Sequence, residues 1–277
     1  MIAALLALPL AGLIAASPTP APAGVRLADI PWTEAEAALT PERVVVLPVG
    51  AGSKEHGPHL PLGNDQVLAD YFAGRLLAAR PVALLPTLTY GFYPAFLEYP
   101  GSVSLSFETQ RDVVAEICRS VARYGPRRFY VLNTGISTVR PLEATAKLLK
   151  EEGILLRFTD LRVAGKKAED QVRKQQAGTH ADEVETSMIL YIDPSLVRMD
   201  RAVKDGSEVR PGPLTRDPKN SEGQYSPSGV FGDATLATRA KGEVIVEGVL
   251  ADVLAEVDAI SREPLPEGRP RSPLDRP

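Results

Sequence analysis

Short runs of β-branched and other apolar residues alternate with longer segments of helical periodicity along most of this chain. Four such runs occupy residues 43–50 (RVVVLPVG), 82–88 (VALLPTL), 128–135 (RFYVLNTG) and 154–161 (ILLRFTDL). Runs of this length are typical of strands that are buried on both faces of a sheet. Because helical segments separate them, the order predicts βα units and an α/β fold with a largely parallel sheet.

The segments between these runs carry apolar residues at helical spacing. In residues 65–80, the side chains of Leu68, Tyr71, Phe72 and Leu76 fall on one helical face. The other segments with a helical pattern are residues 108–125, 137–153, 181–192 and 242–261. Three less regular segments are expected to be a short strand at 102–106, a polar helix or loop at 165–180, and a long ordered loop at 203–232.

Composition restricts the class of protein. The chain has 277 residues, of which 44% are hydrophobic and 24% are charged, which fits one globular domain or at most two small ones. A formal net charge of −4 provides no basic surface, so we expect no nucleic-acid partner. Cys118 is the only cysteine, so no disulfide can form within the chain.

The N-terminal residues 1–24 (MIAALLALPLAGLIAASPTPAPAG) combine a short apolar run with Ala- and Pro-rich sequence. This pattern predicts a secretory signal peptide and a Pro/Ala linker, and therefore an exported, periplasmic or secreted protein that has no membrane contact after cleavage. The alternatives are an uncleaved anchor and a misassigned start codon. We expect the folded domain to span residues 25–262 and a disordered tail to span 263–277.

The segment of residues 50–65 (GAGSKEHGPHLPLGND) holds His56, His59, Glu55 and Asp65 directly after a predicted strand. Ligands bind at the carboxyl ends of parallel strands, and mixed imidazole and carboxylate groups suit zinc, manganese or iron. The alternative is an ordinary polar loop in which Asp65 caps the following helix. Spacing alone leaves both interpretations open.

A second cluster lies in residues 178–187 (GTHADEVETS). On a helix, His180 and Glu183 share a face, whereas Glu185 lies on roughly the opposite side. A histidine held by a carboxylate can act as a general acid or base. The alternative is a solvated acidic first turn, which the helix dipole favours. All three histidines of the chain lie in these two junctions, beside acidic residues.

Four segments together resemble the creatininase (creatinine amidohydrolase) family: LPVGAGSKEHGPHLPLGND, YGFYPAFLEYPGSVSL, THADEVETSMIL and GVFGDATLAT. The resemblance extends from about Val44 to about Glu247 and follows the family's order. It implies a single three-layer α/β/α domain with a largely parallel central sheet, often in a homo-oligomer. It also implies a two-metal site, zinc or manganese, that hydrolyses cyclic amides or related C–N bonds of a small-molecule substrate.

Carrying the family's metal ligands over, residue by residue, shows that the site is altered. His56 and Asp65 match the first histidine and the aspartate nine residues after it. Lys54 stands where the family has a glutamate. In the later NTGIST segment Asn133 is kept, but Gly135 and Ser137 stand where a histidine and an acidic ligand are expected. Two ligands cannot hold two ions, because each ion normally takes three or four protein donors.

We expect Glu55 to replace the missing glutamate, so that His56, Asp65 and Glu55 hold a single ion, with His180 and Glu183 or Glu185 reaching over. The alternative is a metal-free pocket in which Lys54, His56 and His180 bind an anion. The other residues expected to line the pocket are His59, Asn133, Ser137, Thr138 and Glu185, with the Ser137 and Thr138 hydroxyls at a helix N-terminus that suits anions.

The resulting prediction is a hydrolase of amide or related C–N bonds with a reduced or altered metal site. His180 would protonate the leaving nitrogen, and Glu183 would orient the His180 ring. One alternative is a non-catalytic ligand-binding protein that kept the fold and lost the metals. Another is a metal-independent isomerase or lyase that uses His180 and Lys54.

Overall fold

The computed structural model describes residues 24–206 and 212–272. Its centre is a sheet of five strands in the order β1-β3-β2-β4-β5, and every neighbouring pair is parallel. The strands are β1 (Val25–Arg26), β2 (Val44–Val49), β3 (Ala83–Leu84), β4 (Arg128–Asn133) and β5 (Leu155–Phe158). The predicted parallel α/β sheet is therefore confirmed, and the 43–50, 82–88, 128–135 and 154–161 runs each contain a strand.

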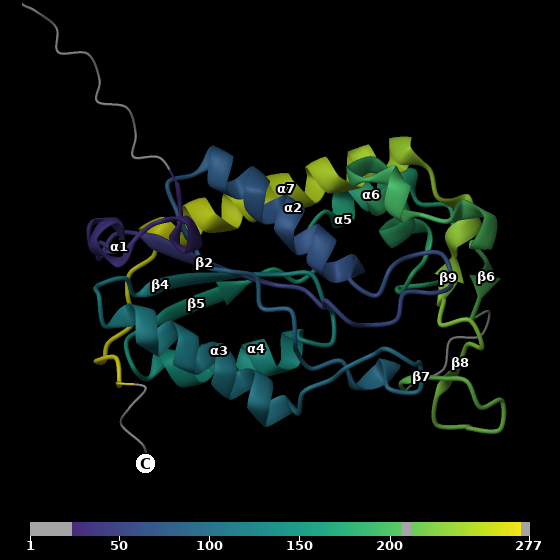
Figure 1. Cartoon of the computed structure of the whole chain (residues 1–277), viewed down its shortest axis with the longest axis horizontal. Helices are drawn as coiled ribbons and strands as arrows, with labels where there is room; N and C mark the ends of the chain where they lie inside the picture. Colours follow the sequence, from purple (N-terminus) through teal and green to yellow (C-terminus); the bar gives the residue numbers. More distant parts are fainter. Residues whose placement is uncertain (1–23, 207–211, 273–277) are drawn as a thin grey trace, which may run out of the picture.

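Helices cover both faces of the sheet, which gives three layers (Figure 1). One face carries α2 (Asn64–Ala79), α5 (Lys166–Val172), α6 (Glu183–Ile192) and α7 (Arg239–Arg262). The other carries α3 (Phe107–Ala122) and α4 (Val139–Lys150), and the short α1 (Trp32–Ala38) lies at one end of the molecule.

Alternation along β2 explains why both faces are covered. Val44 and Val46 pack with residues of α2, α6 and α7, whereas Val45 and Leu47 pack with residues of α3 and α4. All six residues of β2 are buried. A strand that is apolar on both faces requires helices on both sides, as is usual for parallel sheets.

The chain between the end of α6 and the start of α7 crosses the surface, as we expected for residues 203–232. Its described part contains two small ribbons (Figure 1). In one, β6 (Lys204–Asp205) pairs antiparallel with β9 (Gly232–Asp233); in the other, β7 (Leu214–Thr215) pairs parallel with β8 (Gln224–Tyr225). Short 3₁₀ turns occupy Leu27–Asp29, Pro94–Phe96, Pro194–Leu196, Met199–Arg201 and Ala234–Leu236.

Two features of the structure differ from what the sequence predicted. Residues 102–106 form no strand, because the backbone N–H of Val103 bonds to the Ser53 carbonyl in a loop and Ser106 caps α3. The helix α1 was not predicted. Of the tail expected to be disordered, the structure describes residues 263–272, where Arg128 donates to the Glu263 carbonyl and Arg127 to that of Gly268.

The predicted signal peptide and linker lie almost entirely in residues 1–23, outside the described residues. Among the helices of residues 24–206 and 212–272, none has the length and apolar character needed to cross a bilayer.

Candidate active site

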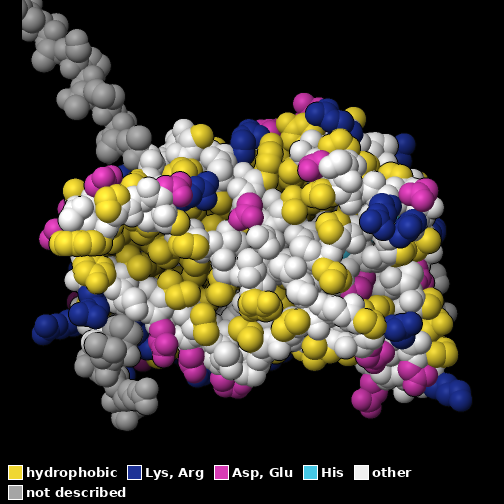
Figure 2. Space-filling model, viewed as in Figure 1, with side chains coloured by type: hydrophobic (Ala, Val, Ile, Leu, Met, Phe, Trp, Pro, Cys, Tyr) yellow, Lys and Arg dark blue, Asp and Glu magenta, His cyan; other side chains and the backbone are white. Residues whose placement is uncertain are grey.

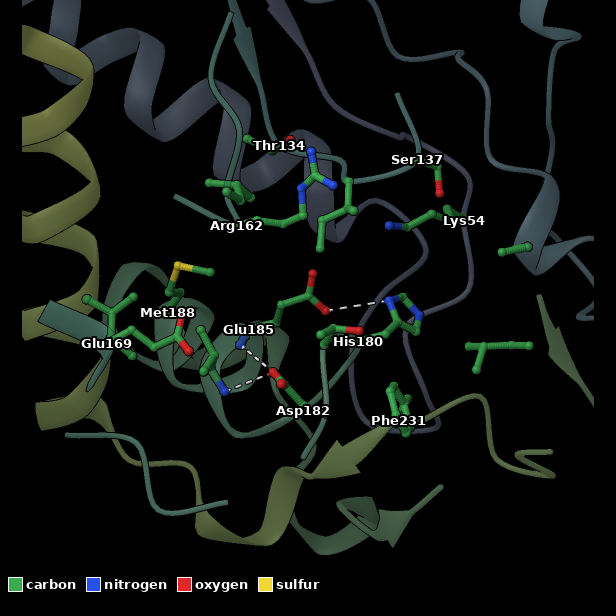
Figure 3. Close-up of a pocket in the computed structure, with 18 of the residues that line it drawn as sticks. Lys54, Thr134, Ser137, Arg162, Glu169, His180, Asp182, Glu185, Met188 and Phe231 are labelled. Atoms are coloured by element: carbon green, nitrogen blue, oxygen red, sulfur yellow. Dashed lines mark hydrogen bonds and ion pairs between the residues drawn. The ribbon is translucent and has the colours of Figure 1, made fainter. Parts of the chain in front are cut away.

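A cavity of about 540 Å³ lies beyond the carboxyl ends of β2 and β4. The loop after β2, the loop after β4, the Pro94–Phe96 turn and the start of α6 all contribute to its wall. Its polar lining includes Lys54, Thr134, Ser137, His180, Asp182 and Glu185 (Figure 3). Apolar lining comes from Phe96, Met188, Leu214, Phe231, Ile245 and Val249.

The His56 ring lies between two hydrogen-bond acceptors and is fully buried. Its Nδ1 is 2.9 Å from the Lys54 carbonyl oxygen, and its Nε2 is 2.8 Å from Oδ1 of Asp65. A neutral imidazole has a single N–H, so it can donate to only one of these two oxygens. A backbone carbonyl that holds Nδ1–H leaves Nε2 as the nitrogen that could bind a metal ion, and such an ion would replace the contact of Nε2 with Asp65.

Asp65 joins His56 to Lys54 at the start of α2. Its Oδ2 lies 2.7 Å from the Lys54 ammonium, and both side chains are buried. Burial opposes ionisation of Asp65, but the positive charge of Lys54 and the contacts with His56 outweigh it and hold the pKa of Asp65 well below its usual range. Lys54 therefore neutralises the charge of Asp65, the aspartate that the family pattern assigns to a metal.

His180 is held between two carboxylates and is also buried. Its Nε2 lies 2.9 Å from the Glu55 carbonyl oxygen and 3.1 Å from Oε2 of Glu55, while its Nδ1 lies 3.6 Å from Oε2 of Glu185. Burial lowers the pKa of His180, yet the hydrogen bond to Glu55 and the charges of Glu55 and Glu185 outweigh burial and raise it. Because Nε2–H donates to Glu55, the Nδ1 nitrogen faces the cavity side.

A strained turn positions His180 and Glu185 together. Ala181 has a φ of 47°, a left-handed conformation that is uncommon outside glycine, and its backbone N–H donates to Oε2 of Glu185 at 2.5 Å. Asp182 caps α6 by accepting from the N–H groups of Val184 and Glu185. Burial and the nearby Glu185 raise the pKa of Asp182 to about 6.

The expected role of Glu183 is wrong. Its carboxylate accepts hydrogen bonds from the backbone N–H groups of Lys174 and Gln175 and forms an ion pair with Lys241. The expectation assumed that His180 was part of the helix, but α6 begins at Glu183, so helical spacing does not relate the two residues. Glu55 and Glu185, not Glu183, contact the His180 ring.

Other expected pocket residues have structural roles. His59 is buried, and its Nε2 pairs with Oγ1 of Thr186 at 2.8 Å. The Asn133 side chain donates to the carbonyl oxygens of Gly135 and Thr159, and its Oδ1 accepts from the Thr138 hydroxyl. The Thr138 hydroxyl is thus used inside the loop, and of the two hydroxyls expected to bind an anion only that of Ser137 lies on the cavity wall.

Within residues 24–206 and 212–272, the structure brings together one group suited to a metal ion. Single ligand atoms of His56, His180 and Glu185 all lie within 4.8 Å of one another, and the two imidazole rings are 4.9 Å apart between centroids. Glu55 is not in this group. Its carboxylate bonds to the His180 ring and to the backbone N–H of Gly57, so the expected replacement of the missing glutamate ligand by Glu55 is not what the geometry shows.

Charge balance around this group fits one divalent ion. Asp65 contacts His56, while Glu55 and Glu185 contact His180, and each of these carboxylates carries one negative charge. Lys54, which is paired with Asp65, carries one positive charge. With neutral imidazoles their sum is −2, a charge that is costly to bury without compensation. A two-ion site does not fit, because Lys54, Gly135 and Ser137 supply no ligand where the family pattern needs one.

These features define an α/β/α protein in which histidines and carboxylates converge on a cavity beyond the ends of parallel strands. The chain belongs to the creatininase family, since the family model described as creatinine amidohydrolase matches residues 28–257. The predicted family is confirmed.

Curated relatives agree with this assignment. The mycofactocin precursor peptide peptidase of Mycolicibacterium smegmatis is 30% identical over 208 residues, which are 73% of this chain and 79% of that protein. The creatinine amidohydrolase of Pseudomonas putida is 28% identical over 266 residues, which are 86% of this chain and 97% of that protein. Relatives of this chain are therefore hydrolases with different substrates.

Solved structures share the fold. A manganese creatininase superposes with a TM-score of 0.74 at 24% identity, and covers 87% of this chain and 100% of its own. A mutant creatininase of Zn-Zn type gives a TM-score of 0.73 at 24% identity, with coverage of 87% and 99%. The three-layer α/β/α architecture implied by the resemblance is thus confirmed.

Proposed function

We propose that this chain is a hydrolase of amide or related C–N bonds that uses one divalent ion, zinc or manganese, held by His56, His180 and Glu185. The convergence of these three side chains, in a cluster whose charges sum to −2, is the observation that carries the proposal. When bound, such an ion polarises a carbonyl group and lowers the pKa of a water molecule.

The chain's own residues would hold and orient this site. The Lys54 carbonyl oxygen orients the His56 ring by its hydrogen bond with Nδ1, and Glu55 orients the His180 ring by its hydrogen bond with Nε2. A ligand role for His180 at Nδ1 replaces the proton-shuttle role that its sequence context suggested. Apolar side chains in the cavity lining, among them Phe96, Met188 and Leu214, favour a substrate with an apolar portion.

The matched pair Glu185→Gln and Glu183→Gln tests the proposal, since both residues lie in α6 and both changes remove one negative charge. Glu185→Gln should lower hydrolysis by about 100-fold and weaken ion binding, because it removes a ligand. Glu183→Gln should retain activity but lose stability, because it breaks the buried contact with Lys241.

The measurement is conversion of creatinine to its ring-opened product, creatine, and release of amine from short peptides. The purified variants are compared at equal protein concentration with zinc or manganese added. Equal activity of the two variants would contradict the assignment of Glu185. Absence of hydrolysis with every substrate and ion, together with metal-independent binding of an anion, would favour the second candidate.

That second candidate is a non-catalytic ligand-binding protein. The buried ion pair of Lys54 with Asp65 favours it, because Asp65, an expected metal ligand, is already paired with a cation. Its ligand would be an anion in the same cavity, and elemental analysis of the protein would find less than 0.1 ion per chain, on the order of contamination.

Export and self-association are further proposals. The sequence of residues 1–24 supports export, and N-terminal sequencing of protein secreted by an expression host would test it. Exposed aromatic side chains support a homo-oligomer: Trp32 is 77% exposed and Tyr124 65% exposed, and hydrophobic side chains gather near α1 on the face shown in Figure 2. Light scattering during gel filtration would give the number of subunits.

A further inference from the structure

Lys54 is a buried cation at the centre of the site. It lies in the loop after β2, and only 4% of the residue is exposed. Its ammonium is 2.7 Å from Oδ2 of Asp65 and lies over two aromatic rings, 4.7 Å from the centroid of Phe96 and 5.6 Å from that of Tyr93. A carboxylate and two π faces together make a pocket that is built for a positive charge.

The space at Gly135, where the family pattern has a histidine, is tightly packed. A Cβ atom placed on Gly135 would lie 3.3 Å from Cε1 of Tyr93 and 3.2 Å from Oγ1 of Thr138. These contacts are tighter than usual packing, so a side chain at position 135 would require the Tyr93 ring and the Thr138 side chain to shift by a few tenths of an ångström.

The Lys54 side chain also reaches the substrate cavity. It is part of the cavity wall, and Figure 3 shows its amine end pointing into the cavity, across from His180 and Glu185. An ammonium has three N–H donors, and Asp65 takes one of them. The remaining donors are available to an oxygen atom of a bound molecule.

From this geometry we propose that the Lys54 ammonium takes the place of a second metal ion beside Asp65 and binds the carbonyl or carboxylate oxygen of the substrate. The inference rests on the proposed function, in which one ion is held by His56, His180 and Glu185. It assigns Lys54 a direct role in binding the oxygen side of an amide or of its carboxylate product.

Two properties of such a site follow from charge. The chain should bind one divalent ion and not two, because the ammonium already satisfies Asp65. The ammonium also repels that ion across a short, poorly solvated distance, so removing its charge should tighten ion binding by about tenfold or more. Removing the same charge should weaken the binding of an oxygen anion in the cavity.

The experiment compares the full chain with Lys54→Gln, using titration calorimetry with Zn²⁺ and then with acetate as a carboxylate probe. Glutamine keeps an N–H donor for Asp65 but removes the charge, which favours retention of the fold. Lys241→Gln is the matched control, since Lys241 also forms a buried ion pair, with Glu183, but does not line the cavity. The number of Zn²⁺ ions bound per unaltered chain is measured without any variant, so this part of the test does not depend on whether a variant folds.

The expected results are one Zn²⁺ per unaltered chain, Zn²⁺ affinity raised about tenfold in Lys54→Gln, acetate affinity lowered about tenfold, and neither changed in Lys241→Gln. Two ions per unaltered chain, or affinities for Zn²⁺ and acetate that stay within about twofold in Lys54→Gln, would overturn the role of Lys54. Failure of the unaltered chain to bind any ion would instead overturn the proposed function itself.

Discussion

His59 is a buried histidine whose protonation opposes folding. Burial lowers its pKa from 6.5 to about 4, although the carboxylates of Glu185 and Glu55 oppose that change. In the unfolded chain the imidazole accepts a proton near pH 6.5, so below that pH the unfolded state binds more protons than the folded state. The stabilising effect of a neutral His59 is complete above pH 6.5 and is lost as the pH falls toward 4.

We therefore expect His59→Gln to flatten the pH dependence of stability. Between pH 7 and pH 4.5, the free energy of unfolding of the unaltered chain should fall by on the order of 2 kcal/mol more than that of the variant. Urea unfolding at a series of pH values measures this difference. Asp182, whose pKa is raised to about 6, contributes a slope of opposite sign to both proteins, so it cancels in the comparison. Parallel profiles would contradict the account.

At the level of single residues, the sequence identified which histidines and acids gather, but not which atoms meet. The expectation that His180 reaches over to His56 agrees with the 4.9 Å between their ring centroids, although His180 follows a loop and not a strand. The sequence pointed to Glu183 as the partner of the His180 ring, whereas Glu185 contacts it, since the turn at Ala181 moves His180 off the helix. A left-handed alanine has no signal in a single sequence, so this detail was not predictable.

Close packing of α6 against α7 requires a residue without a side chain. A Cβ atom on Gly242 would lie 1.8 Å from the Ser187 carbonyl oxygen, whereas one on Gly74 in α2 would meet no atom within 4 Å. Gly242→Ala should therefore destabilise the protein by about 2–3 kcal/mol, because the two helices must separate. Gly74→Ala should stabilise it by about 0.5–1 kcal/mol, because alanine favours a helix.

Thermal unfolding of both variants measures this contrast. Since both replace glycine by alanine within a helix, the difference between them reports helix packing and not helix propensity. A Gly242→Ala protein as stable as the unaltered chain would show that α7 does not lie against α6 as described. The start of α6 forms part of the cavity wall, so this packing also supports the site.

At the level of elements, strands buried on both faces were predictable and short or irregular ones were not. Apolar runs such as residues 128–135 have no other stable location in a folded chain. Residues 102–106 have the apolar and polar alternation of a strand, but Ser104 accepts from the backbone N–H of Tyr93 and Ser106 caps α3 instead. Hydrogen bonds of serine side chains compete with strand pairing in a way that periodicity does not report.

At the level of the whole molecule, the family's fold is retained, while the residues at positions 54, 135 and 137 differ from the ligand pattern that the resemblance implies. The ends of β2 and β4 still bring His56, Asp65 and the Asn133 loop to one edge of the sheet. Lys54 and the Tyr93 ring occupy space where the family pattern supplies ligands. The sequence revealed the changed residues, but only the folded arrangement shows that the lysine is paired with Asp65 and that Glu185 faces both histidines.

The central claim is that one ion, and not two, is held between His56, His180 and Glu185. The most direct test is an anomalous difference map, recorded at the zinc edge, from crystals of the protein grown with Zn²⁺, with His56→Ala as the control. The account predicts a single peak per chain in contact with those three side chains, absent in the control. A second peak beside Asp65, or a peak that persists in His56→Ala, would contradict it.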